Sequence, residues 1–283
     1  MLKIAVQKSG RLYDYSLQLL KECGIEINNG NRQLKAVAFN FPIEIYFLRD
    51  DDIPQYVFDR VADVGFVGEN VVYEKNKDID VVGKLGFGHC RLSIAVPKNM
   101  DYQNIADLQD LKIATSYTRL LQNFLDGKKV NAEIHEISGS VEIAPGIGLA
   151  QAICDLVSSG STLFTNGLKE VEVILNSEAV LIANKNLSGE NKKILGNLQM
   201  RINAVKAAKN NKYIILNAPN AQLKNIATVL PGMKSPTIVP LAESGWSSVH
   251  SVINESDFWE IIEKLKSFGA QGILVVPIEK MIL

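Results

Sequence analysis

Apolar runs and helical periodicities alternate over the first third of the chain. Three apolar runs predict buried strands, at residues 2–6, 43–48 and 64–68. Two segments predict helices, at residues 13–20 and 55–61. Gly24 ends the first helix, and Asp50, Asp51 and Asp52 are N-cap candidates for the second, just before Pro54. Strands that alternate with helices predict an α/β lobe with a largely parallel sheet, whose ligands lie at the carboxyl ends of the strands.

A second lobe is predicted to begin near Gly83, Gly86 and Gly88, three glycines that mark a crossing point between lobes. Beyond them the pattern predicts strands at residues 91–96 and 112–114 and a helix at 120–125. Two further strand-like runs, at 171–175 and 179–183, are expected to return the chain to the first lobe. The predicted division is residues 1–87 and 170–190 for lobe I, and residues 88–169 for lobe II.

The remainder of the chain has a different order of elements. Residues 191–210 predict a helical connector with apolar positions at helical spacing. Residues 211–283 then predict strands at 213–216, 237–241, 247–253 and 272–276, and helices at 221–230 and 258–268. This βαββαβ order is typical of a ferredoxin-like module, and such modules often bind small regulatory ligands.

Composition and charge narrow the class of partner. The 283 residues are 47% hydrophobic and 22% charged, as in a globular protein of two or three domains. Lysine and arginine (30) nearly balance aspartate and glutamate (31), which excludes the basic footprint of a duplex-binding protein and favours a small-molecule partner. No apolar run approaches the roughly 18 residues that span a bilayer. The first ten residues lack the apolar core of a signal peptide, so we expect a cytoplasmic protein that binds neither nucleic acid nor membrane.

The cysteines and histidines are few and scattered. Cys23, Cys90 and Cys154 form no C-x-x-C pair, which argues against a disulfide framework or a zinc knuckle. The three histidines have no H-E-x-x-H spacing, and no G-x-S-x-G motif occurs. We therefore expect neither a histidine-ligated metal nor a serine nucleophile on a strand-to-helix elbow.

The candidate chemistry lies in one stretch, SGSVEIAPGIGLAQAICDLVSSGSTL, from Ser138 to Leu163. Residues 153–157 predict a buried strand and residues 163–168 a helix, with the small residues Ser158 to Thr162 between them. Such a loop presents backbone N–H groups, hydroxyls and the positive end of a helix dipole, which together suit a phosphate. Residues 146–149 predict the start of a short helix, and a helix that continues to Val157 is the alternative to the strand.

Two carboxylates accompany this loop. Asp155 just precedes it, and Glu142 lies earlier in the same stretch. Each feature alone also fits a structural role, because SSGST is typical of a turn and helix cap, and a single carboxylate often accepts structural hydrogen bonds. Together they favour a ligand that carries a phosphate and binds Mg²⁺, since magnesium prefers hard oxygen ligands and keeps phosphates in its shell. A phosphorylated sugar with a pyrophosphate leaving group fits this set.

Seven segments resemble the ATP phosphoribosyltransferase family, which catalyses the first step of histidine biosynthesis. They are QKSGRL (7–12), LRDDDIP (48–54), DVGFVGEN (63–70), CRLSIAVP (90–97), ATSYTRLL (114–121), the Ser138 to Leu163 stretch, and DLVSSGSTLFTNGL (155–168). LPGMKSPTIVPL (230–241) and ILVVPIEKM (273–281) are similar to the extra C-terminal domain of the family's long form.

The resemblance implies a fold, a reaction and an assembly. It implies a two-lobed catalytic core like that of periplasmic binding proteins, followed by a ferredoxin-like regulatory domain. It also implies Mg²⁺-dependent transfer of a phosphoribosyl group from 5-phosphoribosyl 1-diphosphate to N1 of ATP, with release of pyrophosphate. Further expectations are feedback inhibition by L-histidine and a homo-oligomer, from dimer to hexamer.

The resemblance also implies residue roles. The expected catalytic residues are Arg11, Glu142 and Asp155, and the last two are also the expected metal ligands. Binding of 5-phosphoribosyl 1-diphosphate is assigned to Glu142, Asp155, Ser158, Ser159, Gly160, Ser161 and Thr162. ATP binding is assigned to Lys8, Gly10, Arg11, Arg49, Gly68, Glu69 and Tyr117. Histidine binding is assigned to Met233, Ser235, Thr237 and Ala270.

Two other functions fit the same two-lobed α/β fold. A solute-binding or effector-sensing protein would share the architecture, but the paired carboxylates beside a phosphate loop and the missing export signal favour an enzyme. A catalytically dead regulatory homologue is expected to lack Asp155, Glu142 or Arg11, and all three are present.

Overall fold

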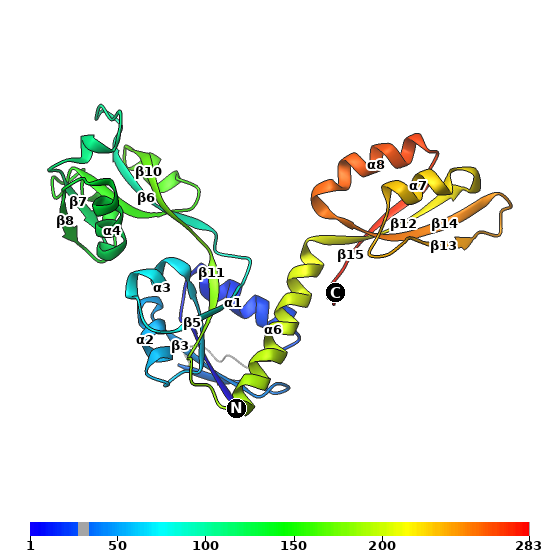
Figure 1. The fold of residues 1–283 in the computed structure, drawn as a ribbon, viewed down its shortest axis with the longest axis horizontal. Coiled ribbons are helices and arrows are strands. Elements are labelled where there is room, and N and C mark those ends of the chain that lie inside the picture. Colours follow the sequence, from blue (N-terminus) through cyan, green and yellow to red (C-terminus); the bar gives the residue numbers. More distant parts are fainter. Residues whose placement is uncertain (28–33, 283) are drawn as a thin grey trace. The chain divides into compact units, whose positions relative to one another are not determined.

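A computed structural model describes residues 1–27 and 34–282 of the chain. The described residues form two compact units: residues 1–21, 25–27 and 34–195 in the first, and residues 22–24 and 196–282 in the second. The first unit holds a six-stranded and a five-stranded sheet, and the second unit holds a four-stranded sheet (Figure 1).

The first sheet contains the amino-terminal strands in the order β2-β3-β1-β4-β11-β5. Their bounds are β1 Leu2–Gln7, β2 Lys35–Val37, β3 Ile43–Leu48, β4 Val64–Gly68, β5 Asp80–Lys84 and β11 Ala179–Ala183. Only β3, β1 and β4 pair in parallel; β2 is antiparallel to β3, and β11 is antiparallel to β4 and β5. The prediction of a largely parallel sheet is therefore wrong outside this centre. The physical reason is that β11 enters the sheet from the second lobe and so runs against its neighbours.

The helices of this lobe are α1 Arg11–Glu22, α2 Ile53–Phe58 and α3 Glu69–Lys75. Asp52 is the N-cap residue of α2, as predicted, but its side chain makes no capping hydrogen bond. The three aspartates form a 3₁₀ turn of their own, Asp50–Asp52. The helix begins two residues before the predicted start, because Pro54 is tolerated in a first turn that needs no N–H from it.

The second sheet has the order β10-β6-β9-β7-β8. Its strands are β6 Cys90–Pro97, β7 Lys112–Thr115, β8 Glu133–Glu136, β9 Ala152–Val157 and β10 Leu168–Ser177. Its helices are α4 Thr118–Lys128 and α5 Ser161–Thr165, with 3₁₀ turns at Ile105–Leu108 and Val141–Ile143. β10 pairs with β6 from Leu168 opposite Pro97 to Ser177 opposite Cys90, so residues 170–177 belong to this sheet. The assignment of residues 170–190 to lobe I is corrected accordingly, since β11 is the first strand back in the first sheet.

The stretch before β9 also differs from its prediction. Residues 144–148 form turns after the 3₁₀ segment, without the helix expected at 146–149. The left-handed backbone of Gly148 (φ +76°) interrupts a helix at these positions. β9 is a strand, so the alternative of a helix that continues to Val157 is excluded. Helix α5 begins at Ser161 instead of Leu163 and ends before β10 begins.

The second unit is ferredoxin-like. Helix α6 (Gly189–Lys209) contains most of the predicted connector and leads into β12 Asn211–Pro219, α7 Leu223–Val229, β13 Thr237–Pro240, β14 Trp246–Asn254, α8 Phe258–Ser267 and β15 Gln271–Pro277. Short 3₁₀ turns, Asn220–Gln222 and Glu255–Asp257, precede α7 and α8. The sheet order β13-β14-β12-β15 is antiparallel throughout, which confirms the predicted βαββαβ module.

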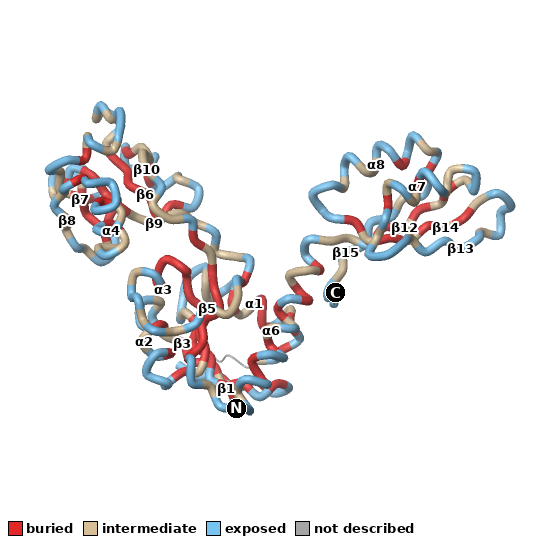
Figure 2. The backbone as a smooth tube through the Cα atoms, in the orientation of Figure 1, coloured by how far each residue is buried: buried red, intermediate tan, exposed pale blue. Residues whose placement is uncertain are grey.

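Each sheet has its own hydrophobic core. In the second unit, alternate residues of β12 (Ile214, Leu216 and Ala218) face α7 and α8 and are fully buried. In the first sheet, by contrast, β4 and β11 are buried along their whole length, as expected for strands covered on both faces. Figure 2 marks these buried positions along the central strands.

Candidate active site

The small-residue loop joins β9 to α5 in the second lobe. β9 ends at Val157, and Gly160 precedes α5 in a left-handed conformation (φ +82°) that favours glycine. The Ser159 and Ser161 hydroxyls lie 3.0 Å apart, and the side chains of Ser158, Ser159, Ser161 and Thr162 are all exposed. The loop thus presents several hydroxyls beside the backbone N–H groups at the start of a helix.

A pocket of about 240 Å³ brings this loop together with charged residues that are distant in the sequence. Arg11, Glu142 and Asp155 line it, together with residues 156–163. Arg11 begins α1 in the first lobe, whereas the other lining residues belong to the second lobe. All the predicted ligands of the sugar diphosphate, and the predicted cation Arg11, therefore share one pocket within the first unit.

A larger hollow of about 560 Å³ lies in the second unit, lined by one side of α6 and by Met281 and Ile282. Its described lining consists of apolar, glycine and amide residues, with no group that titrates near neutral pH. By size alone, this hollow would be the candidate active site. The smaller pocket, however, contains the charged and hydroxyl groups that suit a phosphorylated ligand.

In the smaller pocket, the charge of Glu142 acts on the carboxyl of Asp155. Asp155 lies near the end of β9, and its Oδ1 accepts a hydrogen bond of 2.7 Å from the Leu156 N–H. Burial raises the pKa of the Asp155 carboxyl, and the charge of Glu142 raises it further. A cation bound between the two carboxylates would relieve this repulsion.

These carboxylates fit a magnesium ion. Their oxygens are the hard ligands that Mg²⁺ prefers, and Mg²⁺ usually keeps several waters and ligand phosphates in its shell. Among the residues that the structure describes, no group of three or more histidine, cysteine, aspartate or glutamate side chains is arranged to hold a metal by itself.

Tyr117 lies between the lobes. It precedes α4, and its hydroxyl accepts a hydrogen bond of 3.0 Å from the Asn70 amide at the start of α3. Burial raises the pKa of the Tyr117 hydroxyl, and the charges of Asp155 and Asp50 raise it further. This hydroxyl is therefore within electrostatic reach of the pocket carboxylate Asp155, at a contact between lobe I and lobe II.

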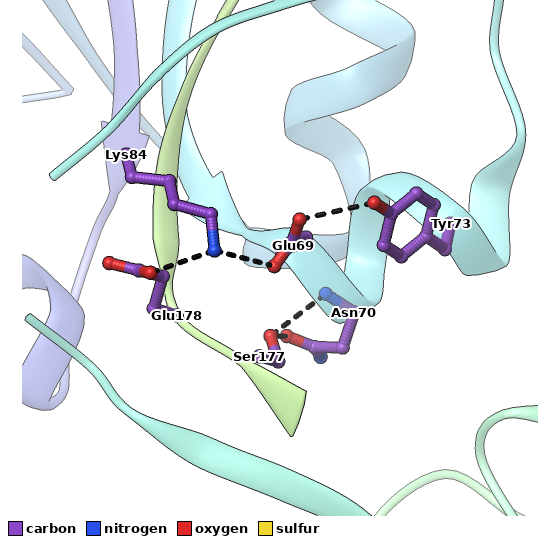
Figure 3. A network of polar contacts seen from close by, with 6 residues as sticks. All are labelled: Glu69, Asn70, Tyr73, Lys84, Ser177 and Glu178. Atoms are coloured by element: carbon purple, nitrogen blue, oxygen red, sulfur yellow. Dashed lines mark hydrogen bonds and ion pairs between the residues drawn. The ribbon is translucent and has the colours of Figure 1, made fainter. Parts of the chain in front are cut away.

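Glu69 belongs to a polar network at the crossing between the lobes (Figure 3). The Glu69 carboxylate is 4.0 Å from Lys84 Nζ and accepts a hydrogen bond from the Tyr73 hydroxyl, while Lys84 also pairs with Glu178 at 3.0 Å. Glu69 is only 9% exposed, and its carboxylate has these partners within the protein. Its role as an ATP ligand stays a prediction.

The same network explains the glycine that precedes Glu69. Asn70 and Ser177 exchange two hydrogen bonds of 3.0 Å, which connect the start of α3 to the end of β10. A Cβ at Gly68 would approach the Asn70 Oδ1 to 2.3 Å, so only glycine leaves room for this arrangement. Gly68 therefore has a structural reason to be glycine, and its role in ATP binding stays a prediction.

Other predicted ATP ligands lie where the parallel strands of the first sheet end, at their carboxyl ends. β1 and β3 are parallel neighbours in register, with Gln7 opposite Leu48, so Lys8 and Arg49 follow the two strands at the same edge. The Lys8 N–H donates to the Leu48 carbonyl at 2.8 Å, and both cationic side chains are exposed. Gly10 adopts φ +87° in the turn between β1 and α1.

Asp50 is a candidate functional residue that the sequence pattern did not single out. Burial raises the pKa of its carboxyl to about 6, and the charge of Asp51 adds to the shift. Its Oδ1 is buried with no hydrogen-bond partner among the described residues. A perturbed carboxyl next to Arg49 is typical of ligand sites. The run of three aspartates was the available signal, but it also fitted helix caps.

The residues predicted to bind histidine do not form one cluster within a chain. Met233 and Ser235 are exposed in the loop before β13, and the exposed Thr237 begins that strand. Ala270 is buried just before β15. β13 and β15 are the opposite edge strands of the sheet, so Ala270 and the Ser235 loop adjoin opposite edges of it in one chain. The role of these four residues in histidine binding stays a prediction.

No helix in the described part of the chain is long and apolar enough to cross a membrane.

Comparisons with known proteins point to one family for both the catalytic core and the C-terminal domain. The family model of ATP phosphoribosyltransferase matches residues 49–204, and the model of that family's C-terminal domain matches residues 208–280. The chain is 59% identical to the ATP phosphoribosyltransferase of Cytophaga hutchinsonii, over 100% of this chain and 99% of the relative. It is 58% identical to the enzyme of the same name from Phocaeicola vulgatus, over the full length of both chains.

Two solved structures resemble this chain in fold, and one of them has the same enzyme name as the relatives. A chain of the ATP phosphoribosyl transferase (HisG:HisZ) complex from Thermotoga maritima matches with a TM-score of 0.62 and 28% identity, over 72% of this chain and 99% of that chain. The substrate binding protein of an amino acid ABC transporter matches with a TM-score of 0.50 at 13% identity, over 74% of this chain and 94% of that chain. The latter likeness concerns the fold alone and agrees with a two-lobed core like that of periplasmic binding proteins. With two family models that together span both units and relatives that match end to end, the chain belongs to the ATP phosphoribosyltransferase family of histidine biosynthesis, in its long form.

Proposed function

We propose that this transferase moves the 5-phosphoribosyl group of 5-phosphoribosyl 1-diphosphate to N1 of ATP. The observation that carries the proposal is the pocket that Arg11, Glu142, Asp155 and the loop of residues 158–162 share. The N1 lone pair of the adenine forms a bond to the anomeric carbon, and the bond from that carbon to the diphosphate oxygen breaks. Its electron pair leaves with pyrophosphate, so no protein nucleophile is required.

The loop is suited to the 5-phosphate. Its exposed hydroxyls and the N–H groups at the start of α5 offer several donors to one anion. Asp155 and Glu142 accept hydrogen bonds from the ribose hydroxyls or bind the magnesium ion. When bound there, magnesium supplies positive charge to the departing pyrophosphate. The protein's own contribution is alignment of the two substrates and electrostatic support for the leaving group.

Cations from the first lobe complete the site. Arg11 lines the same pocket as the carboxylates and is suited to bidentate contact with phosphate oxygens. Lys8 and Arg49 lie at the edge of the first sheet where parallel strands end, which is where open α/β sheets bind ligands. We assign them, with Gly10, Gly68, Glu69 and Tyr117, to the ATP side of the site.

The direct test is product formation by the full chain. The protein is incubated with ATP, 5-phosphoribosyl 1-diphosphate and Mg²⁺, and phosphoribosyl-ATP is followed by mass spectrometry. We expect product that requires both substrates and stops when a chelator removes the metal. Hydrolysis of 5-phosphoribosyl 1-diphosphate without a nucleoside product would contradict the proposal.

We further propose that free L-histidine inhibits the enzyme through residues 211–283. The support is a complete βαββαβ module that contributes none of the described lining of the active-site pocket. Its exposed residues Ser235 and Thr237 offer hydroxyls to an amino acid. A coupling of about 1–3 kcal/mol between the two sites would change activity about 5- to 150-fold.

The expected result is inhibition by millimolar histidine that neither substrate overcomes at saturation. Ser235→Ala and Thr237→Val should weaken this inhibition without changing the uninhibited rate. Thr228→Ala is the control, because this hydroxyl lies on α7 and donates to the Lys224 carbonyl of its own helix, at 3.0 Å. Histidine that competes directly with both substrates, or has no effect, would refute the regulatory assignment and leave the transfer reaction in place.

A further inference from the structure

Arg91 and Glu170 form a two-point ion pair beside the small-residue loop. Arg91 lies on β6 and Glu170 on the neighbouring strand β10. The Arg91 Nε and Nη2 donate to the two oxygens of the Glu170 carboxylate, at 2.5 Å each. The Ser93 hydroxyl donates to the same carboxylate at 2.7 Å. The guanidinium is thus fixed in position and orientation by a partner on the adjacent strand.

The third nitrogen of the guanidinium contacts the loop itself. Arg91 Nη1 donates to the carbonyl of Ser158, the first loop residue, at 3.2 Å. In a planar trans peptide the C=O and the following N–H point in opposite directions. Because Arg91 binds the Ser158 carbonyl, the Ser159 N–H points away from Arg91. The ion pair therefore sets the direction of one of the loop's backbone donors.

Strand β6 also holds the far end of the loop and its helix. Lys98 follows the strand, and its Nζ donates to the Phe164 carbonyl at 3.2 Å and lies 3.5 Å from the centre of the Phe164 ring. The Lys98 N–H donates to the Gly167 carbonyl at 2.9 Å. One strand thus anchors both ends of the segment from Ser158 to Gly167.

The Arg91 guanidinium is paired with Glu170 and does not line the described pocket. Hydrogen bonding from Arg91 holds the pKa of the Glu170 carboxyl below its usual range. The described lining of the active-site pocket includes Arg11 but not Arg91. A guanidinium that already neutralises a carboxylate on a neighbouring strand is a poor direct ligand for a second anion.

We propose that Arg91, held by Glu170, is a positioning residue that orients the Ser158–Ser159 peptide for the sugar phosphate. This inference rests on the proposed function of the loop. It predicts that both members of the ion pair favour binding of 5-phosphoribosyl 1-diphosphate, although one of them is an anion. A direct phosphate ligand would behave differently, since removal of its carboxylate partner would free it to bind the phosphate more tightly.

The test is calorimetric titration of the full chain with 5-phosphoribosyl 1-diphosphate and, separately, with ATP. Glu170→Gln and Arg91→Ala are each expected to weaken binding of the sugar diphosphate about tenfold to a hundredfold, because loss of one charge-assisted hydrogen bond to the phosphate lowers affinity by about that factor. ATP binding should change by less than about twofold, as for distant sites. The double variant should lose little more than either single variant, because both changes break the same contact.

Glu133→Gln is the matched control. Glu133 pairs with Lys112 at 2.9 Å on β8 and β7 of the same sheet, and neither residue is part of the described pocket lining. This change should leave both titrations as in the wild type. Arg91→Lys keeps the charge but loses the two-point geometry, and it is expected to bind the sugar diphosphate more weakly than the wild type.

The outcomes separate this inference from the proposed function. If the wild type binds 5-phosphoribosyl 1-diphosphate and Glu170→Gln binds it equally well or more tightly, the positioning role is wrong and the proposed function stands. Equal weakening of both substrates would show a general structural role and would also overturn the inference. If the wild type does not bind 5-phosphoribosyl 1-diphosphate in the presence of Mg²⁺, the proposed function fails, and the inference fails with it.

Discussion

Asp155→Asn is expected to lower turnover by about a hundredfold or more, because it removes a charge that aligns substrate or metal at the reacting centre. Glu142→Gln should have the same direction of effect. Asparagine keeps the shape of the side chain, so the change tests charge and not packing. Turnover is measured as the initial rate of phosphoribosyl-ATP formation with both substrates saturating.

The same substitution should leave the free energy of unfolding at neutral pH unchanged or slightly higher. Burial and the charge of Glu142 raise the pKa of Asp155, so ionisation of this group costs more in the folded than in the unfolded chain. That cost is absent at acid pH, where the carboxyl is protonated in both states, and appears as the pH rises through the raised pKa. Asparagine never ionises, so the stability of the variant relative to the wild type should increase with pH.

Asp126→Asn is the matched control for this prediction. Asp126 is exposed on α4, where its carboxylate accepts a hydrogen bond of 2.8 Å from Gln122 one turn away. It should keep full turnover. Loss of fold stability in Asp155→Asn with normal turnover would mean that this carboxylate is a structural hydrogen-bond acceptor and no more.

Gly160→Val is expected to weaken binding of 5-phosphoribosyl 1-diphosphate by about tenfold or more, and ATP binding much less. Gly160 has φ +82°, and a β-branched residue there costs roughly 1–3 kcal/mol, so the loop will move to a different conformation. Each charge-assisted hydrogen bond lost to the phosphate costs roughly 1.5–3 kcal/mol, and about 1.4 kcal/mol is a tenfold change in affinity. An added Cβ has space, since its nearest neighbour would be Val157 Cγ1 at 3.9 Å, so the effect comes from the backbone.

Gly139→Val separates backbone strain from loss of phosphate binding. Gly139 has nearly the same φ, +85°, with nothing within 4 Å of an added Cβ, and it is not among the described residues of the pocket lining. Both variants should lose similar stability, but only Gly160→Val should lose affinity in calorimetric titration. Equal affinity of the two variants for the sugar diphosphate would remove the loop from the binding site.

Local patterns predicted most elements of the first unit. The strands at 43–48 and 64–68 have the predicted bounds, because a short apolar run between turn residues is a local signal. The helix at 146–149 was predicted from its apolar spacing, but the left-handed backbone of Gly148 interrupts a helix there. The start of α5 was predicted two residues late, because serine and threonine in a first turn resemble a loop.

Pairings between distant segments had no local signal. β10 was assigned to lobe I because an apolar run shows that a strand exists but not which sheet it joins. The Glu74 carboxylate on α3 accepts hydrogen bonds of 2.9 Å from the N–H groups of Arg119 and Leu120 and so caps α4 across the lobes. A cap supplied by a residue 45 positions away leaves no capping motif beside the helix. The ion pair of Arg91 and Glu170 also joins residues that are distant in the sequence, so no local pattern indicates it.

The candidate site was predicted better than its surroundings. The loop and its two carboxylates lie in one stretch of sequence, and the structure brings Arg11 to them from the other lobe. Asp50 was missed as a candidate because its raised pKa arises from burial, which a run of aspartates does not reveal. Ala270 and Ser235 were expected together because the sequence does not show that their strands are opposite edges of the sheet.

A crystal structure of the full chain with 5-phosphoribosyl 1-diphosphate and Mg²⁺ would show directly whether the loop of residues 158–162 holds the 5-phosphate. We expect the 5-phosphate to contact the N–H groups and hydroxyls of residues 158–162, with the ribose hydroxyls or the metal at Asp155 and Glu142. Density for the sugar diphosphate elsewhere in the chain, with this pocket empty, would show that this loop and its carboxylates are not the binding site.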